Sequence, residues 1–218
     1  MNEFVSLEID FGITGIPYRR SDEGSHSWVN LVEQPEFLDL LPEPNREPIL
    51  RQALIELNGS GSILSTIGCE CWESSQSYGD FEHHRFGAYV ATHFREDKLG
   101  KVAEDCFVVF FRLAQALGEI ASPEPGSVKV LLTLKQFGYL ESNRHGWQME
   151  LTTVCTWNNP VSAKTLWDYW FPTAVRCLMD ASLEVEHFEE TIDRETSAPT
   201  EKSSSGEPAR SKRAKGST

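Results

Sequence analysis

The sequence predicts an α+β fold in which helices pack on one face of a mainly antiparallel sheet of about five strands. Some segments alternate apolar and polar side chains with the period of two that marks a half-buried strand. Others repeat apolar residues at helical spacing. Two pairs of strand-like segments also follow each other across polar links, as in hairpins. The expected order is β-α-β-β-α-β-β-α, with about three helices packed on the sheet.

The first predicted strand spans residues 4–13. We expect its apolar face to be buried, and this face consists of every second residue: Val5, Leu7, Ile9, Phe11 and Ile13. Alternation places Glu8 and Asp10 on the other, solvent-facing side. Residues 16–34 are polar and predict a long loop. Residues 35–57 have a helical apolar pattern, which prolines divide into a short piece and a longer helix.

The next predicted hairpin joins a strand at residues 63–72 to a second strand at residues 83–94. The polar residues 73–80 are expected to form the link between them. Residues 100–120 then change to helical spacing. Phe111 is one of the residues that widen the apolar stripe, so this helix should be largely buried.

The last predicted elements are two strands at residues 128–139 and 147–157, joined by a polar hairpin loop, and a helix at about residues 161–183. We expect Pro172 to kink or break that helix because proline lacks the backbone N–H that a helix interior needs. Four tryptophans in these elements are predicted to lie in the core: Trp147, Trp157, Trp167 and Trp170.

The chain divides into one globular domain, residues 1–188, and a tail, residues 189–218. The tail has Ile192 as its only large apolar side chain and is rich in Ser, Thr, Pro and Gly, so we expect it to be disordered. Its basic end, residues 209–215, is typical of a nuclear-import signal, a nucleic-acid-binding arm or a solubilising tail.

The charge of the domain excludes one class of function and favours another. The 218-residue chain has a net charge of −13, and residues 1–188 hold 27 acidic and 14 basic side chains. Binding to nucleic acid requires a cationic face, so the domain body is not expected to bind nucleic acid. Anionic membrane surfaces are disfavoured for the same reason. The expected partner is another protein, of basic character.

The cysteines and the N-terminal residues indicate a cytoplasmic protein. The first eight residues lack the basic and apolar regions of a signal peptide, and no apolar run approaches the roughly 20 residues that span a bilayer. Five cysteines form an odd set: Cys69, Cys71, Cys106, Cys155 and Cys177. Without a signal peptide, they are interpreted as free thiols in a reducing compartment.

Cys69 and Cys71, with His83 and His84 in the next strand, are the main candidates for catalytic or metal chemistry. Two thiolates and two imidazoles would suit tetrahedral zinc, and a thiol beside a histidine could be a nucleophile. Cysteines two apart on a strand lie roughly 7 Å from each other, however, which is a poor spacing for one metal ion. We therefore predict core thiols with surface histidines, and no metal, cofactor or catalytic residue.

The remaining candidate site is a protein-binding surface. Trp28 and Trp72 lie in or beside polar segments, so they are either core residues or exposed anchors, and tryptophan is enriched at interface hot spots. With Glu8 and Asp10 they are the predicted partner-binding residues. The predicted function is that of a non-enzymatic cytosolic binding protein, an acidic inhibitor or immunity-type protein that occludes a basic partner. The alternative is a small hydrolase or transferase that uses the cysteines and histidines of residues 69–84.

Overall fold

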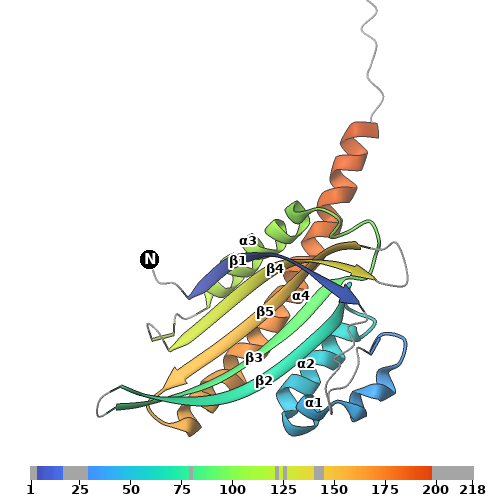
Figure 1. Cartoon of the computed structure of the whole chain (residues 1–218). Helices are drawn as coiled ribbons and strands as arrows, with labels where there is room; N and C mark the ends of the chain where they lie inside the picture. Colours follow the sequence, from blue (N-terminus) through green and yellow to red (C-terminus); the bar gives the residue numbers. More distant parts are fainter. Residues whose placement is uncertain are drawn as a thin grey trace, which may run out of the picture.

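The computed structural model describes residues 4–16, 29–78, 81–120, 123–124, 127–139 and 145–197. Five strands form one mixed sheet with the spatial order β1-β4-β5-β3-β2 (Figure 1). Their bounds are β1 Val5–Ile16, β2 Leu64–Tyr78, β3 Phe81–Phe94, β4 Val128–Tyr139 and β5 His145–Trp157. The β2–β3, β3–β5 and β4–β5 pairs are antiparallel, and only the β1–β4 pair is parallel. The predicted α+β class, the mainly antiparallel sheet and both hairpins are confirmed.

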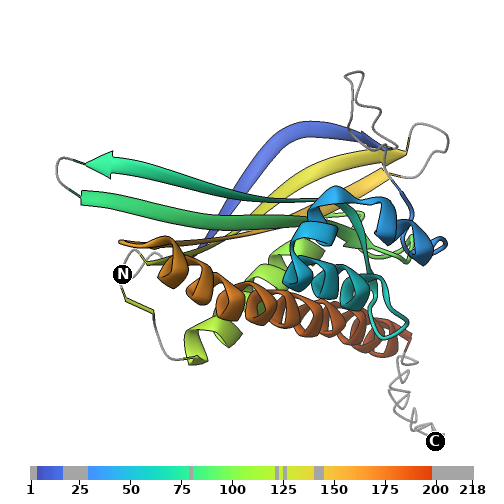
Figure 2. The same ribbon diagram turned by 90° about the horizontal axis from the view of Figure 1, so that it is seen from below.

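The helices pack on one face of this sheet, as Figure 2 shows. They comprise a 3₁₀ turn η1 (Pro35–Leu40) and four α-helices: α1 Pro42–Arg46, α2 Pro48–Asn58, α3 Ala103–Glu119 and α4 Pro160–Ser197. Prolines begin η1, α1 and α2, at the first helical position, where a missing N–H costs no hydrogen bond. Among the described helices, none is both long enough and apolar enough to cross a membrane.

The hydrophobic core fills the space between the sheet and α2, α3 and α4. Every second residue of the central strands enters it, including Val130, Leu132 and Leu134 of β4. Trp167 and Trp170 of α4 are buried there, as predicted, whereas Trp147 and Trp157 near the ends of β5 are only partly buried. The sheet is therefore covered on one face, which strand alternation had indicated.

The predicted burial of the whole apolar face of β1 is wrong. Leu7 packs against the core, but Ile9, Phe11 and Ile13 are exposed. β1 is an edge strand, and its pairing with β4 shifts register between Asp10 and Ile13. The helical layer covers only the first part of β1, so alternation beyond Leu7 does not lead to burial.

One predicted strand boundary and the predicted burial of one side chain also differ in the structure. β2 continues to Tyr78 through residues assigned to a polar link, because strand pairing with β3 satisfies their backbone groups. Phe111 of α3 is exposed, since it lies outside the stripe that packs on the sheet. Figure 2 shows the long β2–β3 hairpin projecting beyond the helices.

The C-terminal helix is also longer than predicted. α4 runs without a break through Pro172 and ends at Ser197, so residues 189–197 of the predicted tail are helical. The charged residues of this segment are good helix formers and need no apolar stripe to satisfy the backbone. Residues 198–218 lie outside the described part of the chain.

Candidate binding face of the sheet

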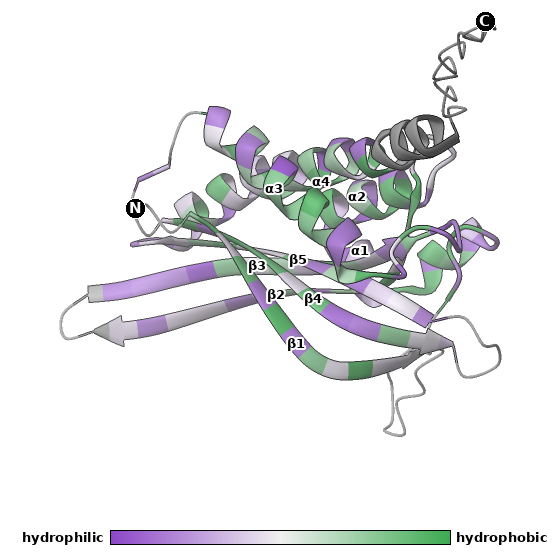
Figure 3. Ribbon diagram, turned by 90° about the horizontal axis from the view of Figure 1, so that it is seen from above, coloured by the Kyte–Doolittle hydropathy of each residue, from purple (hydrophilic) through white to green (hydrophobic). Residues whose placement is uncertain are grey.

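The sheet face opposite the helices carries most of the residues that could bind a partner. We call it the helix-free face, because no helix of the described structure lies on it (Figures 2 and 3). Its centre is formed by partly buried side chains from three strands, and these are Leu131, Thr152, Val154 and Tyr89. Carboxylates and basic side chains surround them: Glu8, Asp10, Glu70, Glu150, Arg85, Lys129 and Lys135. An apolar centre with a polar rim is the usual composition of a protein-binding surface.

Trp72 lies on this face and is partly buried. It pairs with Gly87 of β3, and a Cβ atom added to Gly87 would come within 2.6 Å of the indole ring. The ring therefore rests directly on the glycine backbone. Arg85 and Tyr89 flank Gly87 on the same face of β3, one on each side. Trp, Tyr and Arg are the residue types most enriched at interface hot spots.

Glu8 and Asp10 lie on the same face, at the opposite edge of the sheet. Both are exposed, and they align with Thr133 and Lys135 of β4. The Lys135 Nζ atom lies 3.6 Å from Asp10 Oδ2 and 3.2 Å from Glu150 Oε2, so one lysine bridges two carboxylates. Four strand spacings separate this edge from β2, and Trp72 also lies several residues farther along β2 than the positions that align with Glu8 and Asp10, so the carboxylates lie roughly 25–30 Å from Trp72. The structure thus brings three of the four predicted binding residues to one face, without mutual contact.

Trp28, the fourth predicted binding residue, lies outside the described residues. Sequence reasoning missed Arg85 and Tyr89. The signal was present, because the predicted burial of the alternate residues of β3 implies that Arg85, Gly87 and Tyr89 share the other face. What the sequence did not show is that Gly87 lies opposite Trp72, since this depends on the pairing register of β2 and β3.

His93 is also on the helix-free face, but it is buried and hydrogen-bonded. Its Nδ1 lies 2.6 Å from the carbonyl oxygen of Phe94, so Nδ1 carries the hydrogen and donates it. Its Nε2 then accepts from the Tyr139 hydroxyl at 3.0 Å. Phe137 packs against the ring of His93 at a centroid distance of 5.1 Å. This arrangement suits a structural histidine that joins the ends of β3 and β4.

The structure separates the thiols from the histidines that sequence reasoning had grouped with them. Cys71 pairs with Ala88, so His84 lies four residues farther along β3, roughly 13 Å away. His83 is on the opposite face of the sheet from Cys71. His84 instead lies with its Nε2 3.7 Å from Glu82 Oε2. Within the described residues, no group of three or more His, Cys, Asp or Glu side chains could hold a metal ion.

The environment of the two thiols also disfavours nucleophilic chemistry. Burial, reinforced by the nearby charge of Glu43, raises the pKa of Cys69 to about 12. Burial and then Glu47 raise the pKa of Cys71 as well. A thiol with a raised pKa carries almost no thiolate near neutral pH, and the thiolate is the reactive form.

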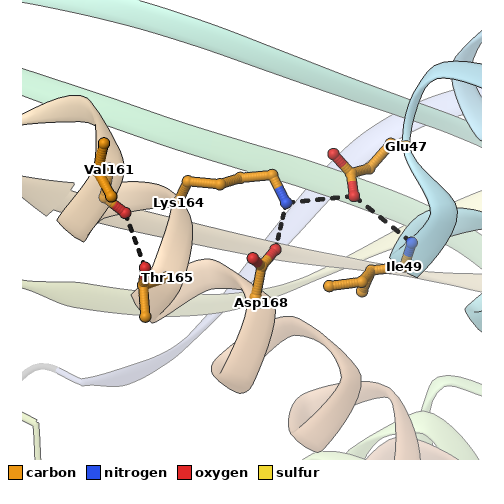
Figure 4. Close-up of polar contacts among 6 residues, drawn as sticks. All are labelled: Glu47, Ile49, Val161, Lys164, Thr165 and Asp168. Carbon is orange, nitrogen blue, oxygen red and sulfur yellow. Dashed lines mark hydrogen bonds and ion pairs between the residues drawn. The ribbon is translucent and has the colours of Figure 1, made fainter.

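A second polar cluster lies on the helical side of the sheet, around Lys164 of α4 (Figure 4). The Lys164 amine donates to Glu47 Oε1 at 3.2 Å and also to the Asp168 carboxylate. It lies over the ring of Trp167, 4.8 Å from its centroid, and at a similar distance from a phenylalanine of β3. Glu47 also accepts from the N–H of Ile49 and so caps α2.

The Lys164 cluster joins α4 to the start of α2. Its cation, the Lys164 ammonium, belongs to the chain itself and is paired with the carboxylates of Glu47 and Asp168. We interpret it as a structural link between helices, because the lysine already occupies the position that a bound cation would take.

Comparisons of the chain with protein-family models, with curated proteins and with solved structures found no match.

Proposed function

We propose that this protein is a non-enzymatic binding protein that occludes a basic protein partner, as an inhibitor or immunity-type protein does, and that the partner docks on the helix-free face. The observation that carries the proposal is the group formed by Trp72, Arg85 and Tyr89 around Gly87. Because the indole ring is held against the glycine backbone, it loses little conformational freedom on binding. Such preorganisation increases affinity.

The charge of the molecule supports the choice of a basic partner. The net charge of −13 comes from residues 1–188 and attracts a cationic protein before contact. The helix-free face itself carries both signs, with Lys135 held between Asp10 and Glu150. We therefore assign steering to the whole body, and affinity and orientation to the contacts around Trp72.

The test is a kinetic comparison once affinity capture with mass spectrometry has identified a partner. Replacing Trp72 with Ala should raise the off-rate by about tenfold or more, while the on-rate stays nearly constant. The matched control is Tyr169→Ala, which removes an exposed aromatic side chain from α4. Equal effects of the two substitutions would show that binding does not use the helix-free face.

A second measurement tests the electrostatic part of the proposal. Raising the salt concentration shortens the range of charge interactions to roughly 8–10 Å at physiological ionic strength, so the on-rate should fall and the off-rate should change less. Glu8→Gln should lower the on-rate slightly. An on-rate that does not respond to salt would contradict the assignment of a basic partner.

A further inference from the structure

We propose that the outer edge of β1 is a self-association site, at which a second copy of this chain pairs antiparallel to β1 about a two-fold axis at Phe11. The two sheets would then join into one continuous sheet across the axis. This inference does not depend on the proposed function, which uses the helix-free face.

β1 exposes large apolar side chains. Phe11 is 84% exposed, Ile13 73% and Ile9 38%. They follow one another at alternate positions of an edge strand, whose outer side has no strand neighbour in the described structure. Such an edge presents a template for another strand. Figure 3 shows hydrophobic bands along β1, whereas the far parts of β2 and β3 are hydrophilic.

The backbone N–H and C=O groups of alternate β1 residues point away from the sheet. The Val130 N–H donates to the carbonyl oxygen of Phe4 at 2.8 Å, so the even-numbered residues at the start of β1 direct their N–H and C=O groups toward β4. The alternate residues Val5, Leu7 and Ile9 therefore direct theirs outward. Beyond the bulge, Ile13 aligns with Gln136, which restores the outward direction at the odd-numbered residues.

The β1 sequence also suits pairing with a second copy of itself. With Phe11 on the two-fold axis, Ile9 faces Ile13 of the other copy, and Asp10 faces Gly12. Glu8 then faces Thr14, so no carboxylate lies opposite another. A register centred on Ile9 would instead place Glu8 opposite Asp10, and like charges that face each other across strands are destabilising.

The bulge at Phe11 and Gly12 is compatible with this pairing. The Gly12 N–H donates to Asp10 Oδ1 at 2.9 Å, so this amide is already satisfied within β1. The proposed inter-copy hydrogen bonds use Leu7, Ile9, Ile13 and Gly15, which lie on either side of the bulge. The same residues of each copy would form the interface, as a two-fold axis requires.

The dimer should be weak and should strengthen as salt rises. Three exposed side chains per copy cover less than the roughly 800 Å² per partner of a standard interface. Two bodies of charge −13 also repel each other, and salt screens that repulsion. The salt response is therefore opposite to the one expected for a basic partner, so the two proposals can fail independently.

The experiment is sedimentation of the full chain over a range of protein and salt concentrations. The expected result is a monomer at low concentration and a dimer whose fraction increases with both variables. Ile13→Lys should abolish the dimer. Val161→Lys is the matched control, because Val161 of α4 is 74% exposed and also β-branched. Equal unfolding midpoints of the three proteins would confirm that both variants fold.

Three results would overturn the proposal. One is a chain that stays monomeric at every concentration and salt. Another is a dimer that Val161→Lys weakens as much as Ile13→Lys does. The third is a monomeric chain in which Ile13→Lys weakens the binding of a captured basic protein, because the β1 edge would then accept a strand from that protein.

Discussion

β1 and β2 are both edge strands, and each pairs with a single neighbour in the described sheet, yet they expose opposite chemistry. β2 buries apolar residues only at its start and then exposes an unbroken polar run, Glu73 to Ser77. β1 is partly buried at its start, where Val5 and Leu7 pack against the core, but it then exposes Ile9, Phe11 and Ile13. Polar and charged edges are protected against pairing with other chains, whereas apolar edges are not.

This difference shows what alternation measures. A period of two predicts which side chains share a face, but it does not predict whether anything covers that face. Figure 2 shows the β2–β3 hairpin extending beyond the helical layer, whereas β1 curves away from that layer. The side chains in these parts of both strands are therefore not constrained by core packing.

The largest expected effect is a loss of folding stability when a buried aliphatic residue of one edge strand is truncated. An exposed aliphatic residue of the other edge strand serves as the comparison. Leu64 of β2 is fully buried, so Leu64→Ala should lower the free energy of unfolding by about 2–5 kcal/mol. Ile13→Ala on β1 should change it by less than about 0.5 kcal/mol. Denaturant unfolding of both variants measures the difference. Comparable losses would mean that the β1 edge is covered in solution.

The next largest loss of stability is expected when the hydrogen bonds that hold the start of β2 are removed. The Arg95 guanidinium donates to the carbonyl oxygens of Leu64, Leu57 and Gly59, which joins β2 to the end of α2. Arg95→Met should cost about 2–3 kcal/mol, because it leaves three partly buried acceptors without this donor. Arg112→Met, at an exposed ion pair with Glu184, is the control and should cost less than about 0.5 kcal/mol.

A smaller effect is expected at the contact between Trp72 and Gly87. Gly87→Ala places a methyl group where the indole ring lies, so the ring must move and stability should fall by about 1–3 kcal/mol. In Gly138→Ala the new methyl group meets no atom within 4 Å, so this control should be neutral or slightly stabilising. Tryptophan fluorescence should shift in the first variant alone. An unchanged spectrum with unchanged stability would contradict the described position of Trp72.

The smallest effect is a pH dependence that belongs to β2. The pKa of Cys69 is raised from 9.0 to about 12, so between these values the unfolded chain loses a proton that the folded chain keeps. The free energy of unfolding should therefore fall as pH rises above 9, by about 1 kcal/mol at pH 10 for this thiol. Cys69→Ala should make the decline less steep, whereas Ser74→Ala at an exposed site should leave it unchanged. Identical slopes in all three proteins would refute the raised pKa.

The sequence by itself determined the α+β class, the two hairpins, the buried tryptophans of α4 and the side of β1 on which Glu8 and Asp10 lie. These features depend on local periods of 2 and 3.6 residues and on proline positions, which a single chain displays directly. The tertiary structure decided the rest. The parallel pairing of β1 with β4, the contact of Trp72 with Gly87 and the distance between Cys71 and His84 all depend on strand order and register. Residues far apart in the sequence set this strand order and register. The extent of the helical layer is also a tertiary feature, and it leaves Phe11 and Ile13 exposed although their spacing matches that of buried residues.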